Sequence, residues 1–210
     1  MPGTRKAPAD VDVRSALLDA AGEILAREGP SALTTRRVSA AAGTTTQSIY
    51  TLFGGKEGIV RAMYREGYAR LAARMRRVRV TDDPLRDLLE LGRAYRAAAL
   101  ASPNFYDVMF GRPVPEFTPD SEDLAIAQGT RDVLAAAVRR VVDAGLLQPG
   151  VDADDVAQWL WAVVHGLVSL ELAGALDLGP KRGVSHVYDA YLARSLSGYV
   201  RASTIDGSRR

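Results

Sequence analysis

Apolar residues recur at helical spacing along nearly the whole chain, and no segment alternates strictly between apolar and polar residues as a half-buried strand would. One stripe contains Val13, Leu17 and Ile24, with Asp10 or Asp12 as the candidate N-cap and Gly29-Pro30 after it. This stripe predicts a first helix over residues 12–28. The same reasoning predicts further helices near residues 45–52, 56–78, 84–101, 103–110, 121–145, 152–174 and 184–200. The chain is therefore predicted to be all-α.

Two short helices follow the first one, within residues 34–55. A threonine stands before each, either Thr34 or Thr35 and then either Thr44 or Thr45, and glycine ends each. In the second helix Ile49, Leu52 and Phe53 share one face, which leaves the other face polar. Two short helices joined by a tight turn, the second of them amphipathic, are typical of a helix-turn-helix whose second helix enters the major groove of DNA.

The polar face of that second helix carries the residue types that DNA recognition uses. A glutamine amide can pair with adenine, and threonine or serine can contact base edges through hydroxyl or methyl groups. Basic residues nearby and a lysine at a helix start suit phosphate groups. A solvated helical face would also be polar, but the turn and the basic neighbours favour DNA. The predicted DNA contacts are Thr35, Arg36, Arg37, Thr45, Thr46, Gln47, Ser48, Tyr50, Thr51 and Lys56.

Read as one string, SALLDAAGEILAREGPSALTTRRVSAAAGTTTQSIYTLFGGKEGIV strongly resembles the N-terminal DNA-binding domain of the tetracycline-repressor (TetR) family. The resemblance covers about residues 12–60 and implies a cap at Thr45, a groove-facing Thr46 and a phosphate-contacting Tyr50. The sequence departs from the family pattern at Thr44, where an aliphatic residue is usual, at Gln47, where glycine is frequent, and at Thr51, where histidine is frequent. These departures bear on which operator is read, because Gln47 adds a group that can read a base.

The resemblance also implies the organisation of the chain. A three-helix DNA-binding domain at residues 12–60 would be joined by a long helix to a larger dimerisation and ligand-binding domain at residues 61–201. Residues 1–11 would form a flexible basic arm and residues 202–210 a disordered tail. Such a protein is expected to be a repressor that binds a palindromic operator as a homodimer, is released by a small-molecule effector and needs no cofactor.

Two segments of the C-terminal half, NFYDVMFG and WLWAVVHGL, resemble a regulatory-domain subtype marked by Trp161, His165 and Gly166. The helix expected at residues 152–174 is apolar almost all round, apart from a narrow stripe of small and polar residues. Small residues let a second helix approach closely, so this stripe and the last helix are predicted to form a four-helix dimer interface. The interface residues would be Gln158, Ala162, His165, Ser169, Tyr188, Tyr191, Leu192, Ser195 and Tyr199. For His165, a ligand contact or a core position bonded to a carbonyl remain alternatives.

Aromatic and soft apolar residues in the same half are candidates for an effector pocket, because such pockets are mostly apolar with a few polar groups. Ordinary core positions are the alternative for each of them. The candidates are Tyr95, Phe105, Tyr106, Met109, Phe110 and Trp159.

Charge and composition narrow the possible functions. Residues 1–80 contain 14 Lys and Arg against 7 Asp and Glu, whereas residues 81–210 contain 13 against 18, as expected when one end meets a polyanion. The chain has no cysteine, which excludes disulfides and thiolate metal sites, and residues 1–10 lack a secretory apolar run. The apolar stretch at residues 156–178 carries His165, Glu171 and Asp177, which argues against a membrane span. A cytoplasmic protein without membrane contact is expected.

Two other functions are alternatives to DNA binding. An enzyme is disfavoured because the two histidines, His165 and His186, have no further group at nucleophile or metal-ligand spacing, and no metal site is expected. The GGKEG segment also lacks residues that a phosphate-binding loop requires. A helical small-molecule-binding or partner-binding protein without DNA-binding activity is the second alternative, and an intact reading face argues against it.

Overall fold

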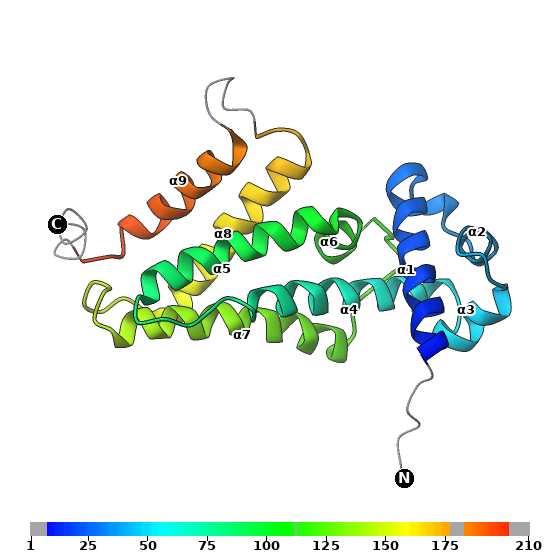
Figure 1. Ribbon diagram of the computed structural model, residues 1–210, viewed down its shortest axis with the longest axis horizontal. Helices are drawn as coiled ribbons and strands as arrows, with labels where there is room; N and C mark the ends of the chain where they lie inside the picture. Colours follow the sequence, from blue (N-terminus) through cyan, green and yellow to red (C-terminus); the bar gives the residue numbers. More distant parts are fainter. Residues whose placement is uncertain (1–7, 112, 177–182, 202–210) are drawn as a thin grey trace, which may run out of the picture. The chain divides into compact units, whose positions relative to one another are not determined.

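The computed structural model describes residues 8–111, 113–176 and 183–201 (Figure 1). Within these ranges the chain is helical and contains no β-strand, only one isolated bridge between Leu147 and Val200. The all-α prediction is confirmed. The predicted tail at residues 202–210 and most of the predicted basic arm lie outside the described residues.

The helices begin and end close to the residues that the sequence predicts. They are α1 (Pro8–Glu28), the 3-10 helix η1 (Pro30–Ala32), α2 (Thr35–Ala41), α3 (Thr46–Phe53), α4 (Lys56–Met75), α5 (Pro84–Ala101), α6 (Pro103–Phe110), α7 (Ser121–Asp143), α8 (Ala153–Leu172) and α9 (Val184–Ser197).

Two helix ends differ from their predicted positions. Helix α1 begins at Pro8, so neither Asp10 nor Asp12 is its N-cap. Proline suits a helix start because the first N–H groups have no partner in the helix anyway. Helix α4 ends at Met75 and not near Val78, because Val78 donates to the carbonyl of Met75, three residues back, and this tighter turn closes the helix.

The chain divides into two compact units. One contains Met1–Tyr68 and Ser102–Ile126, and the other contains Ala69–Ala101 and Ala127–Arg210. The boundaries pass through α4 and α7, and they place α6 with the N-terminal helices. The predicted boundary between residues 60 and 61 lies within α4, and as a division between DNA-binding and regulatory functions it stays a prediction.

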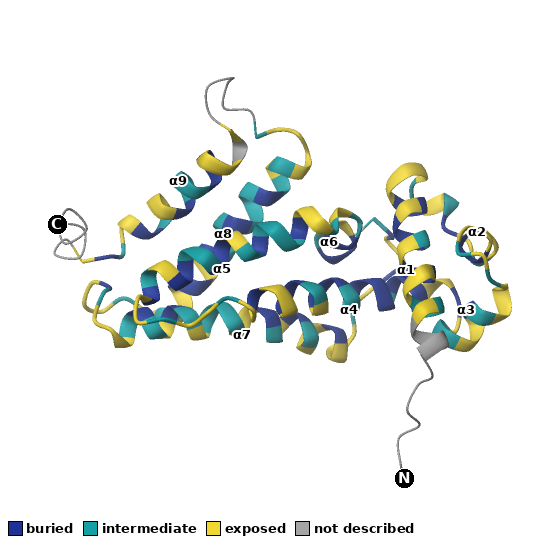
Figure 2. Cartoon of the chain, in the orientation of Figure 1, coloured by how far each residue is buried: buried dark blue, intermediate teal, exposed yellow. Residues whose placement is uncertain are grey.

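In the first unit, α1 packs against α2 and α6, and α2 packs against α3. The core contains Leu17, Leu33, Val38 and Ile49, all with no exposed surface. Burying each of these side chains stabilises the fold by roughly 1.5–3 kcal/mol relative to leaving it exposed. Figure 2 shows the result as buried stripes along helices whose other faces are exposed. The core therefore fixes α3 against α2, and α2 against α1.

In the second unit, α8 packs against α5 and α9, and α5 packs against α9. Buried residues on α8 recur every fourth position, at Val156, Leu160, Val164 and Val168. Polar contacts add to this packing, since the Arg96 guanidinium forms two hydrogen bonds with the Glu171 carboxylate, at 2.5 and 2.7 Å. These contacts position α8 and α9, which carry most of the predicted interface residues.

Candidate DNA-binding interface

The turn between α2 and α3 is fixed by side-chain caps and one glycine. The Thr34 hydroxyl accepts the N–H of Arg37 at 3.3 Å, and the Thr45 hydroxyl accepts the N–H of Ser48 at 3.3 Å. These two residues are thus the N-caps among the four predicted threonines. Gly43 has a φ of 65°, a left-handed conformation that other residues rarely adopt. Together they set where α3 begins.

The two faces of α3 differ as the sequence predicts. Ile49 is completely buried, and Leu52 and Phe53 are half-buried. The guanidinium of Arg14 on α1 lies over the Phe53 ring, 5.5 Å from its centroid. On the other face Tyr50 is 55% exposed, although tyrosines are usually more buried. Helix α3 is therefore held by one face and presents the other.

Most of the predicted base-reading residues lie on the exposed side. Thr46 and Gln47 are exposed, as are the predicted cap Thr45 and the predicted phosphate contact Thr51, and Gly54 ends the helix in a left-handed conformation. Ser48 differs, because it is half-buried and its hydroxyl lies 3.0 Å from the Thr44 hydroxyl and 3.2 Å from that of Thr45. The unusual Thr44 thus serves the internal hydrogen bonding of the turn.

The predicted phosphate contacts differ in exposure and in the hydrogen bonds that they already make. Arg36 is exposed and Thr35 half-buried. The Nη2 of Arg37 donates to both carboxylate oxygens of Glu28 at 2.6 Å, so a phosphate bound by Arg37 would share the guanidinium with Glu28. The Lys56 ammonium donates to the carbonyl of Pro30 at 3.3 Å, and it retains two further N–H donors for an anion.

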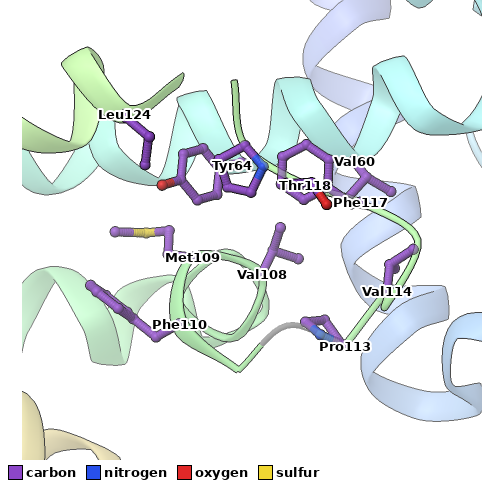
Figure 3. A pocket seen from close by; sticks show the side chains of 11 residues that line it. Val60, Tyr64, Val108, Met109, Phe110, Pro113, Val114, Phe117, Thr118 and Leu124 are labelled. Atoms are coloured by element: carbon purple, nitrogen blue, oxygen red, sulfur yellow. The ribbon is translucent and has the colours of Figure 1, made fainter. Parts of the chain in front are cut away.

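A pocket of about 420 Å³ lies in the same compact unit, between α4, α6 and the segment that leads into α7 (Figure 3). Of the predicted pocket residues, Met109 and Phe110 line it. Phe105 and Tyr106 are buried on α6 but do not line it, Tyr95 is buried in the other unit, and Trp159 is 46% exposed. The lining residues are Val60, Tyr64, Val108, Met109, Phe110, Pro113, Val114, Phe117, Thr118, Pro119 and Leu124.

Most of these lining residues were missed by sequence reasoning. Val114 and Phe117 stand in a proline-rich segment, which was predicted only as a loop. Both are nevertheless buried, at 5% and 7% exposure. Two large apolar residues within a short loop are the signal that could have pointed to the pocket.

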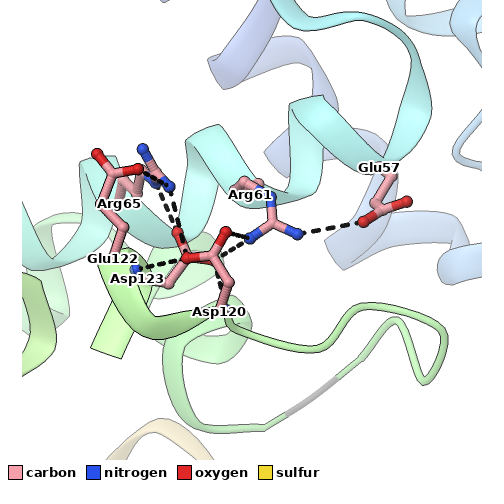
Figure 4. Close-up of polar contacts among 6 residues, drawn as sticks. All are labelled: Glu57, Arg61, Arg65, Asp120, Glu122 and Asp123. Atoms are coloured by element: carbon pink, nitrogen blue, oxygen red, sulfur yellow. Dashed lines mark hydrogen bonds and ion pairs between the residues drawn. The ribbon is translucent and has the colours of Figure 1, made fainter. Parts of the chain in front are cut away.

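A cluster of charged residues lies beside the pocket and joins α4 to the start of α7 (Figure 4). Asp123, whose side chain has no exposed surface, accepts hydrogen bonds from Arg61 and, at 2.5 Å, from Arg65. Arg61 also binds Asp120 at 2.7 Å, and Arg65 binds Glu122 at 3.0 Å. We call these five residues the arginine clamp. The hydrogen bond between Arg65 and Asp123 raises the pKa of Arg65.

The clamp is also part of the α7 helix start. The Asp120 carboxylate accepts the N–H of Asp123 at 2.9 Å, and the Asp123 carboxylate accepts the N–H of Asp120 at 3.0 Å. This reciprocal pair is a capping box built from two aspartates. The N–H of Asp123 is the main reason that the pKa of Asp120 is lowered. Asp123 therefore caps a helix and binds two arginines at once.

Comparison with known families agrees with this geometry. Residues 17–63 match the model described as bacterial regulatory proteins, tetR family, and residues 88–194 match the model described as tetracyclin repressor-like, C-terminal domain. The chain belongs to the TetR family. It is accordingly a DNA-binding transcription regulator and not an enzyme. No curated protein matches the sequence.

Several solved structures share the fold of this TetR-family chain. A protein of unknown function from Rhodococcus sp. RHA1 is 24% identical, with a TM-score of 0.75 over 96% of this chain and 100% of its own. The fatty acid degradation regulator FadR from Bacillus halodurans is 16% identical, with a TM-score of 0.74 over 93% and 98%. SmeT, the repressor of the Stenotrophomonas maltophilia multidrug efflux pump SmeDEF, is 21% identical, with a TM-score of 0.69 over 91% and 93%.

The predicted dimer residues differ in burial and fall into three groups. Tyr188 and Leu192 are buried in the core of their own unit, and the Tyr188 hydroxyl donates to the carbonyl of Gly92 at 2.7 Å. Gln158 and Ala162 are exposed. The remaining predicted interface residues are half-buried: His165, Ser169, Tyr191, Ser195 and Tyr199.

His165 lies beside an aromatic residue of its own helix. Its imidazole stacks on the Trp161 ring, with centroids 5.8 Å apart, and burial lowers its pKa. A lowered pKa favours the neutral form, which is also the form that packs against apolar surface without a charge penalty.

Within the described part of the chain, no helix has the length and hydropathy that a bilayer-spanning segment requires. The described residues also contain no group of three or more His, Asp or Glu side chains arranged to bind a metal ion.

Proposed function

We propose that the chain is a ligand-responsive repressor, which binds a palindromic DNA operator as a homodimer and is released by a small molecule. The exposed face of α3 carries the proposal. Thr46, Gln47 and Tyr50 project from a helix whose start is capped by Thr45 and whose opposite face is anchored by Ile49. A rigid helix with a polar, solvent-facing side can enter the major groove without first being ordered.

Each α3 would read one half-site of the operator. Gln47 is the residue assigned to a base, because a glutamine amide can donate to and accept from adenine at the same time. Tyr50, Arg36 and Lys56 are assigned to phosphates, which fix orientation without reading sequence. Two such helices must lie about 34–36 Å apart to reach successive major grooves.

The homodimer would be formed by α8 and α9, in a chain of the Trp-His-Gly subtype. Three large apolar residues of α8 are exposed in the monomer: Trp159 at 46%, Leu170 at 47% and Leu172 at 37%. Ala162 is small enough to let a second helix approach. Large apolar side chains exposed on a helix favour a partner, and in a homodimer a second copy of the same helices would cover them. Tyr188 and Leu192 would support this surface from within the protomer.

Release by a small molecule would be a shift of population. The effector must bind the conformation that reads DNA poorly more tightly than the one that reads it well. The pocket in the unit that contains α3 supports this arrangement, because its wall and α3 both connect to α4. SmeT, which shares the fold, is described as a repressor, and this agrees with the proposed direction of control.

Fluorescence anisotropy tests the proposal. The purified protein is titrated onto labelled DNA from the intergenic region beside its own gene and onto a scrambled duplex, at several salt concentrations. Binding that is tight, salt-dependent and selective for the intergenic DNA is expected. If wild type and Gln47→Ala both bind the two duplexes equally, sequence reading by Gln47 is contradicted. The matched control is Gln128→Ala, which removes an exposed glutamine from α7. No binding to either duplex would favour the alternative of a helical binding protein without DNA activity.

A further inference from the structure

We infer that the pocket between α4, α6 and the start of α7 is the effector site, and that it selects a neutral, largely apolar molecule. The inference rests on the proposed function and adds the site and the chemical class of the ligand. The volume of about 420 Å³ lies within the range of roughly 300–1,000 Å³ that small-molecule sites occupy.

The chemistry of the walls indicates the ligand class. Aliphatic and aromatic side chains and one methionine make most of the surface, and none of the described lining residues carries a charge. Tyr64 and Thr118 bring the only side-chain hydroxyls among the described lining residues. Such a pocket gains free energy by removing apolar ligand surface from water, whereas a charged group placed there would lose its hydration without a partner.

The charged residues beside the pocket do not change this assignment, because they are bound to one another. Arg61 contacts Glu57, Asp120 and Asp123, and Arg65 contacts Asp123 and Glu122. An anionic ligand would have to displace a carboxylate that is already in place. Figure 4 shows both guanidinium groups directed toward the carboxylates at the start of α7. A neutral ligand leaves the arginine clamp intact on entry.

Phe117 connects the pocket wall to the clamp. Its ring lies 5.6 Å from the Tyr64 ring, measured between centroids, and the Arg61 guanidinium lies over it at 5.4 Å. A ligand that displaces the ring therefore acts on Arg61. Arg61 belongs to α4, which begins at Lys56, directly after α3 and the pair Gly54-Gly55. The route from ligand to reading helix thus lies within one compact unit.

A pocket-filling variant tests the site without disturbing the core. Leu124 lines the pocket and is 55% exposed, so Leu124→Trp places an indole at its edge with little cost to folding. Ala125→Trp is the matched control, because the same residue is added one position along the same exposed helix surface, outside the lining. The probe is Nile red, a neutral apolar dye whose emission rises and shifts to shorter wavelength in apolar sites. Circular dichroism verifies that both variants fold.

Wild type and Ala125→Trp are expected to bind Nile red with affinities that agree within about twofold, and Leu124→Trp should bind at least about tenfold more weakly. Absence of binding to wild type, or equal affinity for all three proteins, would overturn the assignment of the site. The anionic dye 1-anilinonaphthalene-8-sulfonate tests the ligand class. If it binds more tightly than Nile red and Leu124→Trp abolishes its binding, the neutral class is wrong.

Release from DNA is measured separately, so that the two proposals can fail independently. Nile red should lower the anisotropy of a complex with labelled intergenic DNA for wild type and Ala125→Trp, but not for Leu124→Trp. If the protein binds no DNA, the proposed function fails while the dye titrations still decide the pocket. If DNA is bound and Nile red occupies the pocket without releasing it, the effector role of this pocket is refuted.

Discussion

Asp123→Asn removes one negative charge from the centre of the arginine clamp while keeping the shape of the side chain. Asp123 is the fully buried member, and it contacts the guanidinium groups of Arg61 and Arg65. The asparagine retains one oxygen, which can still accept the N–H of Asp120. Its NH₂ group, however, is a donor and cannot accept the arginine N–H groups that the carboxylate oxygen accepted. The variant therefore tests the charge and not the packing.

The magnitude follows from burial. Breaking a buried ion pair by removing one partner costs about 3–5 kcal/mol, because the other charge is left unpaired. Here the arginine side chains are 25% and 29% exposed, and they keep Asp120 and Glu122 as partners. Water can reach them in part, so we expect a loss of about 2–3 kcal/mol. For a chain of this size that loss lowers the unfolding midpoint by about 4–12 °C.

The assay is unfolding by urea and by heat, followed by circular dichroism at one fixed protein concentration. Glu122→Gln is the control, because it removes the same charge from the neighbouring residue, whose side chain is 71% exposed. It should change the free energy of unfolding by no more than about 0.5 kcal/mol. Added salt should reduce any effect of Glu122→Gln and leave that of Asp123→Asn. Equal stability of the two variants would refute the argument that burial makes Asp123 the strong member of the clamp.

Three further predictions concern the reading helix and the pH dependence of stability. Gln47→Ala should cost about 1–3 kcal/mol at one base position, whereas Lys56→Ala should weaken binding to every sequence and reduce the salt slope by about one unit, as anisotropy on operator variants can measure. Thr45→Ala removes the N-cap of α3 and should lower the free energy of unfolding by about 1 kcal/mol in urea, with no change for Thr51→Ala as the check. The third concerns Asp87, whose pKa is lowered to about 2, first by the Thr81 N–H and then by the Thr81 hydroxyl and Arg140. Because the folded pKa lies below the usual value, this stabilisation is present above about pH 4 and is lost as the pH falls toward 2. Urea titrations at pH 5, 3.5 and 2.5 should therefore show a shallower loss for Asp87→Asn than for wild type, and parallel curves would contradict the assignment.

Local signals were enough to predict the helix-turn-helix. The caps Thr34 and Thr45, the turn at Gly43 and the inward position of Ile49 all depend on residues close together in sequence. The bounds of α5 and α6 also match their predicted positions, and a proline starts each of these helices.

The pocket and the clamp could not be predicted in this way. Phe117 stands in a segment without helical periodicity, so the local pattern predicts a loop and does not show which side chains its apolar residues will contact. Arg61 and Asp123 are 62 residues apart in the chain, and each alone resembles an ordinary charged residue on a helix. Tyr188 shows a related limit, because an apolar position on α9 does not reveal whether its own protomer or a second copy will cover it.

Residues near the start of α7 differ in how much a substitution would cost in stability. Asp123 has three tasks, since it caps a helix and binds two arginines, so nearly any substitution there carries a cost in stability. Thr118 and Leu124 line the same pocket but are exposed, and a change at either can reshape the site with little effect on the fold. Under the proposed effector assignment, substitution at these two positions would change which ligand binds while the contacts between α4 and α7 stay the same.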